Sequence, residues 1–165
     1  MSENDVQVDA FELQDTAQDS PGRCALAYPA LSAHEPAPST CYASFFECFN
    51  HQKYFEAHDA LEKQWLANRH TPEANFYKGL IQLAGAFVHL QKKRIGPAVA
   101  LLQRSSIHLT PYAPIFMQLD LRALLSFIES LISDLRNGEI RPDLLAPHHA
   151  PKLGLMEAQE AAQSL

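Results

Sequence analysis

Cysteine is scarce in this chain, and no pattern suggests that it binds a metal or forms disulfides. The three cysteines, Cys24, Cys41 and Cys48, include no CxxC pair. An odd number leaves at least one thiol unpaired, which is typical of a reducing compartment. On one helix Cys41 and Cys48 would lie about 10 Å apart along the axis, too far for a disulfide. We therefore expect a cytoplasmic protein with free thiols.

Long apolar runs are missing as well. No stretch approaches the roughly 18 to 20 apolar residues of a membrane-spanning helix, and neither end has the apolar region of a signal peptide. We expect a soluble protein without a membrane partner.

The chain also lacks a strongly basic region. Its formal net charge is −6, and the acidity lies in the two ends: residues 1–38 hold seven acidic residues against Arg23 alone. Residues 39–141 hold eleven basic against nine acidic residues, so the body is nearly neutral. Nucleic-acid binding needs a basic stripe or face, and we expect no nucleic-acid partner.

Several catalytic motifs are absent. The chain has no glycine-rich phosphate loop, no HExxH motif of zinc proteases and no ExxH pair of ferritin-like di-iron proteins. Ser105 and Ser106 lack the strand-turn-helix context of a serine nucleophile. No complete catalytic set is therefore visible.

What is present is helical periodicity without β alternation, which predicts an all-α fold, a compact bundle of about five antiparallel helices over residues 39–141. Residues 1–38 have no sustained hydrophobic period, and we interpret them as a disordered acidic leader. We interpret residues 142–165 as an irregular C-terminal tail. Five helices are expected. The first covers residues 41–50 with Ser39 or Thr40 as its cap, and the second covers residues 52–67. The third has Thr71 as its cap and Pro72 in its first turn, the fourth covers residues 98–109 after Pro97, and the fifth covers residues 121–135 and is followed by Gly138.

The chemistry-bearing stretch is YFEAHDALEKQW, residues 54–65. His58 and Glu62 are four residues apart and share a helix face, and Phe55 and Leu66 flank them on the same stripe. We therefore expect a histidine and a carboxylate directed at the core.

Antiparallel pairing about a turn near residue 70 places residues whose numbers sum to about 140 at equal height. His58 then lies level with Gln82 and Glu62 with Lys78, while His89 would be about 10 Å away from His58 along the axis. For antiparallel pairing about the next turn, near residue 94 or 95, the same reasoning places His108 level with Gln82. The candidate binding cluster is Glu56, His58, Asp59, Glu62, Trp65, Lys78, Gln82 and His108.

Three interpretations of this cluster remain open. His58, Glu62 and His89 could ligate a divalent metal. His58 and a carboxylate could act as general acid and base. The cluster could instead be a hydrogen-bonded network that fixes helix register, and we favour this interpretation because buried polar groups usually satisfy one another. A lysine beside Glu62 would compete with a metal for the carboxylate.

The same residues resemble a known family. The patterns YFEAHExLExxW and GLIQxAxAxxH of domain of unknown function 309 are similar to residues 54–65 and 79–89, with Asp59 in place of a frequent glutamate. The resemblance covers roughly residues 45 to 115. It implies a small all-α protein with a shared polar motif. Some members carry a metal-dependent hydrolase label, which would assign a metal to His58, Glu62 and His89 or His108.

We expect a non-catalytic binding or scaffold module, acting as a homo-oligomer or on a protein partner and needing no cofactor. The alternative is a metal-dependent hydrolase that uses His58 and Glu62 with a histidine from a neighbouring helix, holding zinc, manganese or iron.

Overall fold

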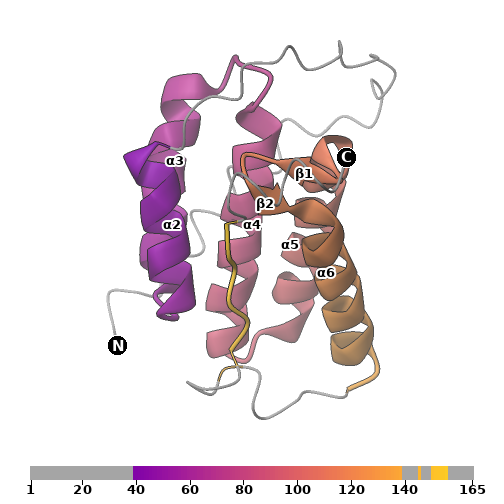
Figure 1. Cartoon of the computed structure of the whole chain (residues 1–165). Helices are drawn as coiled ribbons and strands as arrows, with labels where there is room; N and C mark the ends of the chain where they lie inside the picture. Colours follow the sequence, from indigo (N-terminus) through magenta and orange to yellow (C-terminus); the bar gives the residue numbers. More distant parts are fainter. Residues whose placement is uncertain (1–38, 139–144, 146–149, 156–165) are drawn as a thin grey trace. The chain divides into compact units, whose positions relative to one another are not determined.

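The computed structural model describes residues 39–138, 145 and 150–155 (Figure 1). The predicted acidic leader and most of the predicted tail lie outside these residues. The helices are α2 (Thr40–Asn50), α3 (Tyr54–Asn68), α4 (Ala74–Gln91), α5 (Ile95–Leu109) and α6 (Leu121–Arg136). The predicted all-α class is confirmed. None of the described helices combines the length and the apolarity of a membrane-spanning segment.

Each helix packs on the next one in the chain, as expected of a bundle with short connections: α2 on α3, α3 on α4, α4 on α5 and α5 on α6. Figure 1 shows α4 between the pair α2 and α3 and the pair α5 and α6. Residues 79–90 of α4 are all buried, which explains why its sequence is apolar on most faces.

Two of the predicted helix ends are confirmed in detail. The Ser39 side chain accepts a hydrogen bond from the Tyr42 N–H at 3.2 Å and caps α2. Gly138 follows α6 with a φ of 76°, the left-handed conformation that glycine adopts without strain.

The predicted start of α4 is wrong. Its N-cap is Glu73, two residues beyond Thr71. The Thr71 hydroxyl instead donates to the Asn68 carbonyl at 2.9 Å, and the Tyr112 hydroxyl donates to the Pro72 carbonyl. Residues 69–73 therefore form a turn at the end of α3, and α4 begins only after this turn.

A short hairpin, which the sequence did not predict, joins α5 to α6. After a 3₁₀ turn, β1 (Ile115–Phe116) pairs antiparallel with β2 (Leu119–Asp120). Met117 and Gln118 between them both have positive φ, the geometry of a type I′ turn. The Tyr42 hydroxyl donates to the Met117 carbonyl at 3.0 Å and ties this turn to α2.

Two contacts fix the register of α3 against α4. The rings of Tyr54 and Phe87 lie 4.9 Å apart between centroids, and the Gln64 side chain hydrogen-bonds the Tyr77 hydroxyl. Both pairs of residue numbers sum to about 141, close to the predicted 140. His58 therefore lies level with Gln82 and Leu83 along the helix axes.

Helices α4 and α5 approach each other closely at Gly79. The Ser105 hydroxyl donates to the Gly79 carbonyl at 2.8 Å. A Cβ atom at Gly79 would lie 2.7 Å from Leu109 Cγ and 3.3 Å from His108 Cβ. His108 is thus placed beside Gly79, about one helical turn before Gln82.

Candidate functional site

Helix α3 buries little of its surface. Its fully buried residues are Tyr54, Ala57 and Leu61, a stripe with helical spacing that faces the neighbouring helices. The opposite stripe, which we call the outer face of α3, consists of Phe55, Asp59, Glu62 and Leu66, all within about 60° of one another around the helix.

The prediction that Phe55 and Leu66 lie on the core stripe is wrong. Phe55 is 49% exposed and Leu66 is 54% exposed. The physical reason is that α3 packs through Tyr54, Ala57 and Leu61, about 100° to 180° around the helix from Phe55 and Leu66. An apolar stripe in a sequence does not itself say whether a helix or a partner covers it.

His58 lies at the boundary between the outer face and the buried stripe. Its ring stacks on Phe55 with 6.5 Å between centroids and 16° between planes. Its Nε2 atom is buried. Burial lowers the pKa of His58 from 6.5 to about 4, against a smaller opposing effect of Asp59. At neutral pH the imidazole is therefore uncharged.

Glu62 lies one turn further along α3 and is half-buried. Its pKa is raised by burial and, second, by the negative charge of Asp59. Asp59 is itself exposed and pairs with Lys63 at 3.0 Å. The helix thus carries a neutral histidine beside a carboxyl group that is less readily ionised than usual.

Two further members of the predicted cluster, Glu56 and Trp65, lie on the flanks of the outer face. Glu56 is exposed, in the first turn of α3, where a carboxylate interacts favourably with the helix dipole. Trp65 is half-buried. Neither residue shares the fully buried environment of Gln82.

The remaining members lie on α4 and α5. Gln82 is 1% exposed, and Lys78 and His108 are half-buried. The Oε1 atom of Gln82 and the Nε2 atom of His108 are buried, as is Nε2 of His58. Each of the three helices therefore contributes one buried polar atom.

His89, the third predicted metal ligand, is 1% exposed. On the observed register it lies level with the residues just before α3, about 10 Å along the axis from His58. Within the part of the chain that the structure describes, no three His, Cys, Asp or Glu side chains are grouped closely enough to hold a metal ion. His58, Glu62 and His89 form no such group there.

The sequence interpretation missed two features of this domain. One is the clamp between Asn50 and Leu153, which joins α2 to residues 150–155. The other is the Tyr54 hydroxyl, which is buried and has no hydrogen-bond partner among the described residues. No local pattern marks either feature, because each depends on residues brought together from distant parts of the chain.

Comparison with known proteins agrees with the resemblance seen in the sequence. Residues 42–101 match the model of a family described as Domain of unknown function (DUF309). The match contains most of α2, all of α3 and α4 and the first part of α5, and with them His58, Glu62, Gln82 and His89. No curated protein matches the chain. No solved structure matches it either.

Proposed function

We propose that this helical domain is a non-catalytic protein-binding module whose contact surface is the outer face of α3. The observation that carries the proposal is the half exposure of Phe55 and Leu66 at the two ends of that face. Full burial of such a side chain contributes roughly 1.5 to 3 kcal/mol, so each leaves about half of this available for a partner.

The charge on the outer face indicates the chemistry of the partner. Asp59 and Glu62 lie between the two apolar residues, and Glu56 lies on the flank together with Lys63, which pairs with Asp59. The three acidic residues outnumber this one basic residue. A helix with apolar residues at three- and four-residue spacing and with Lys or Arg beside them would complement this surface. We therefore assign a basic amphipathic helix as the partner.

The same charges argue against a second copy of this chain. If two outer faces packed antiparallel so that Phe55 met Leu66 of the other copy, Asp59 would lie opposite Glu62. Carboxylates facing each other in an apolar contact are unfavourable. A cationic partner avoids this repulsion.

His58 supports the outer face from below. Because its ring is neutral and stacked on Phe55, it presents an apolar plane to the phenyl group. A charged imidazole at this position would draw water to the base of Phe55. His58 thus has a structural part in the proposed module.

The chain's only tryptophan provides a direct test. Trp65 flanks the outer face, so its fluorescence should report binding of a tryptophan-free peptide. We would titrate the full chain with a helical peptide of about 18 residues, about five turns, bearing Leu on one face and Lys on the other. A saturable fluorescence change is expected. Phe55→Ala and Leu66→Ala should each weaken binding about 5- to 10-fold, equivalent to roughly 1 to 1.4 kcal/mol.

Ile107 provides the matched control, because it is a large hydrophobic residue on α5 that is 67% exposed. Ile107→Ala should leave the affinity unchanged, and a peptide with Glu in place of Lys should not bind. Equal losses in Phe55→Ala and Ile107→Ala would contradict the proposal. So would stoichiometric zinc, manganese or iron in untagged protein purified without added metal, if it disappeared in His58→Ala, since that result would favour the metal-dependent hydrolase.

A further inference from the structure

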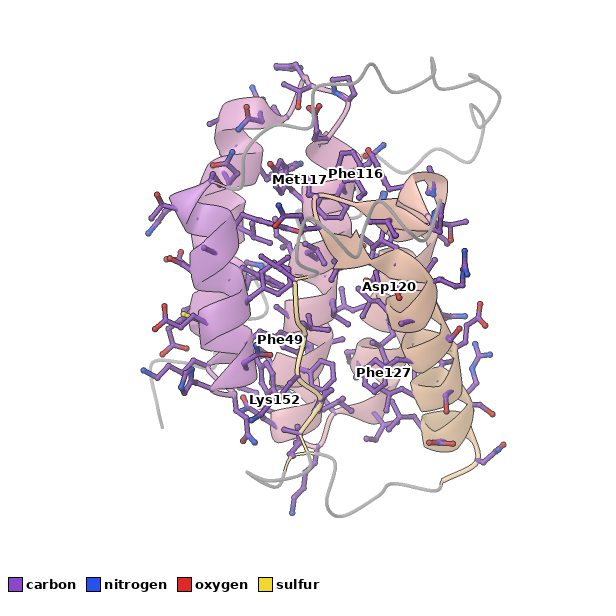
Figure 2. All side chains as sticks on the ribbon, viewed as in Figure 1. Phe49, Phe116, Met117, Asp120, Phe127 and Lys152 are labelled. Atoms are coloured by element: carbon purple, nitrogen blue, oxygen red, sulfur yellow. The ribbon has the colours of Figure 1, made fainter. Side chains whose placement is uncertain are left out.

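Residues 150–155, which we call the strap, lie in an extended conformation on the helical body. Burial alternates from residue 151 to residue 155: Pro151, Leu153 and Leu155 are half-buried, and Lys152 and Gly154 are exposed. Ala150 is also half-buried. This period of two is that of a β-strand with one face on a protein surface. Figure 1 shows the strap in yellow, crossing in front of α4 in this view and ending beside β2, and Figure 2 marks Lys152 within it.

Asn50, the last residue of α2, holds the middle of the strap. Its Nδ2 donates to the Leu153 carbonyl at 2.8 Å, and its Oδ1 accepts from the Leu153 N–H at 2.8 Å. A side-chain amide thus offers one donor and one acceptor to a single residue, as a neighbouring strand would. This contact involves only the backbone of Leu153, so it does not depend on which side chain residue 153 carries.

The end of the strap is held by the hairpin. Leu155 forms an isolated antiparallel bridge with Leu119 of β2. Leu119 also pairs with Phe116 of β1, so the strap adds a third extended segment to the edge of the two-stranded sheet. Addition of an extended segment to a sheet edge is a general mode of peptide recognition.

The strap is only partly buried. None of residues 150–155 is fully buried, whereas Phe49 and Leu119 beside the two anchor points are 0% and 3% exposed. The strap therefore lies on the core and is not part of it. Its release would leave the backbone-reading clamp and the sheet edge in place.

We propose that Asn50 and the edge of β2 form a receptor for an extended peptide with apolar residues at alternate positions, and that the strap occupies it as a displaceable intramolecular ligand. The partner that fits is an extended Leu-x-Leu segment of another protein. Because the strap is covalently attached, its effective concentration is high, and a free peptide binds well only when the strap is displaced. This surface is separate from the outer face of α3 and does not depend on the function proposed for it.

The first experiment measures docking of the strap in the full chain by amide hydrogen exchange. The Leu153 amide should exchange at least ten times faster in Asn50→Ala than in the unaltered protein. Asn68→Ala is the matched control, because Asn68 donates only within its own helix, to the Gln64 carbonyl at 2.8 Å. Unchanged exchange at Leu153 in Asn50→Ala would overturn the proposal.

The second experiment tests recognition in trans. A fluorescent peptide with the sequence of residues 150–155, APKLGL, is added to full-length chain carrying Leu153→Asp and Leu155→Asp, which undock its own strap. It should bind this variant at least tenfold more tightly than the unaltered chain, and addition of Asn50→Ala should remove the binding. Equal affinity with and without Asn50 would overturn the proposal.

A third measurement needs no substitution and covers the case in which the double variant does not fold. Excess unlabelled APKLGL peptide added to the unaltered chain should accelerate exchange of the Leu153 amide. No acceleration at saturating peptide would overturn displacement. A concentration-dependent dimer that exchanges straps would overturn the assignment to a foreign segment and identify a second copy as the occupant.

Discussion

Ser105 on α5 donates a hydrogen bond of 2.8 Å to the backbone carbonyl of Gly79 on α4, at a point where the two helices are in close contact. The glycine leaves the carbonyl accessible because it has no side chain between the helices. Leu109 occupies the space that a Cβ atom would need. The glycine at position 79 of α4 therefore permits the close packing of α5.

Gly79→Ala should destabilise the domain although alanine is the better helix former. The new Cβ atom would lie 2.7 Å and 2.8 Å from two atoms of the buried Leu109 side chain, so the helices must separate or Leu109 must change rotamer. We expect a net loss of about 1 to 3 kcal/mol in the free energy of unfolding, measured with urea. Gly96→Ala is the control: outside its chain neighbours and the backbone of its own helix, no atom lies within 4 Å of its Cβ position. It should change the free energy of unfolding by less than about 1 kcal/mol, because the gain in helix propensity is opposed by the restriction that Pro97 places on the residue before it.

The burial of His58 should make stability depend on pH. Its pKa in the folded state is about 4, below the ordinary value of 6.5, so the unfolded chain binds the proton more tightly. The contribution of His58 to the free energy of unfolding is constant above pH 6.5, falls as the pH drops from 6.5 to 4, and levels off below pH 4. The full change is on the order of 3 kcal/mol.

We would compare urea unfolding of the unaltered chain and of His58→Gln between pH 7.5 and pH 4.5. The unaltered chain should lose more stability over this range than the variant does. Parallel pH profiles for the two proteins would show that His58 is equally easy to protonate in the folded and unfolded states.

Glu62 should have the opposite dependence. Because its folded pKa is raised, the ionised form is disfavoured in the folded state, and the group destabilises the domain at neutral pH relative to acid pH. Glu62→Gln should therefore raise the unfolding free energy at pH 7, and this advantage should disappear as the pH falls below 4.5, the ordinary pKa of the group. A variant that is equally stabilised at both pH values would point to packing and not to charge.

Tyr54→Phe should stabilise the domain by about 1 kcal/mol. The Tyr54 hydroxyl is buried without a hydrogen-bond partner among the described residues, while its ring packs 5.0 Å from Phe49 and 4.9 Å from Phe87, measured between centroids. Removal of the hydroxyl keeps the ring contacts and relieves an unsatisfied polar group.

Tyr77→Phe is the matched control for this substitution. The Tyr77 hydroxyl bonds to Met117 Sδ at 3.7 Å and to Gln64, so its loss should destabilise the domain by about 1 kcal/mol. Thermal unfolding of the two variants should therefore shift in opposite directions. A decrease in the midpoint of Tyr54→Phe would mean that its hydroxyl has a favourable interaction in solution.

Much of the fold could be predicted because it depends on local chemistry. The spacing of apolar residues identified the helices, and Ser39 and Gly138 marked two of their ends. The register of α3 against α4 followed from the short turn between them, since a tight connection leaves little freedom in height. The start of α4 was mispredicted because Thr71 and Pro72 bond to residues outside that helix, on α3 and on the 3₁₀ turn.

The candidate site could be predicted only in part. The pattern YFEAHDALEKQW identified His58 and Glu62 as unusual, and their pKa values are indeed shifted by burial. It could not say on which side of α3 the neighbouring helices would pack, and Phe55 and Leu66 were assigned to the wrong side. The hairpin escaped prediction because Met117 and Gln118 are not the residues that commonly mark a type I′ turn.

The sequence by itself determined the helices, their order and the residues with chemistry to offer, because periodicity and capping act within a few residues of each other. Tertiary structure alone decided which face of α3 stays open, how closely α5 approaches Gly79 and where the strap lies. Asn50 and Leu153 are 103 positions apart, and only the tertiary fold brings them together. Contacts of that kind depend on the summed geometry of the whole bundle, which no local pattern encodes.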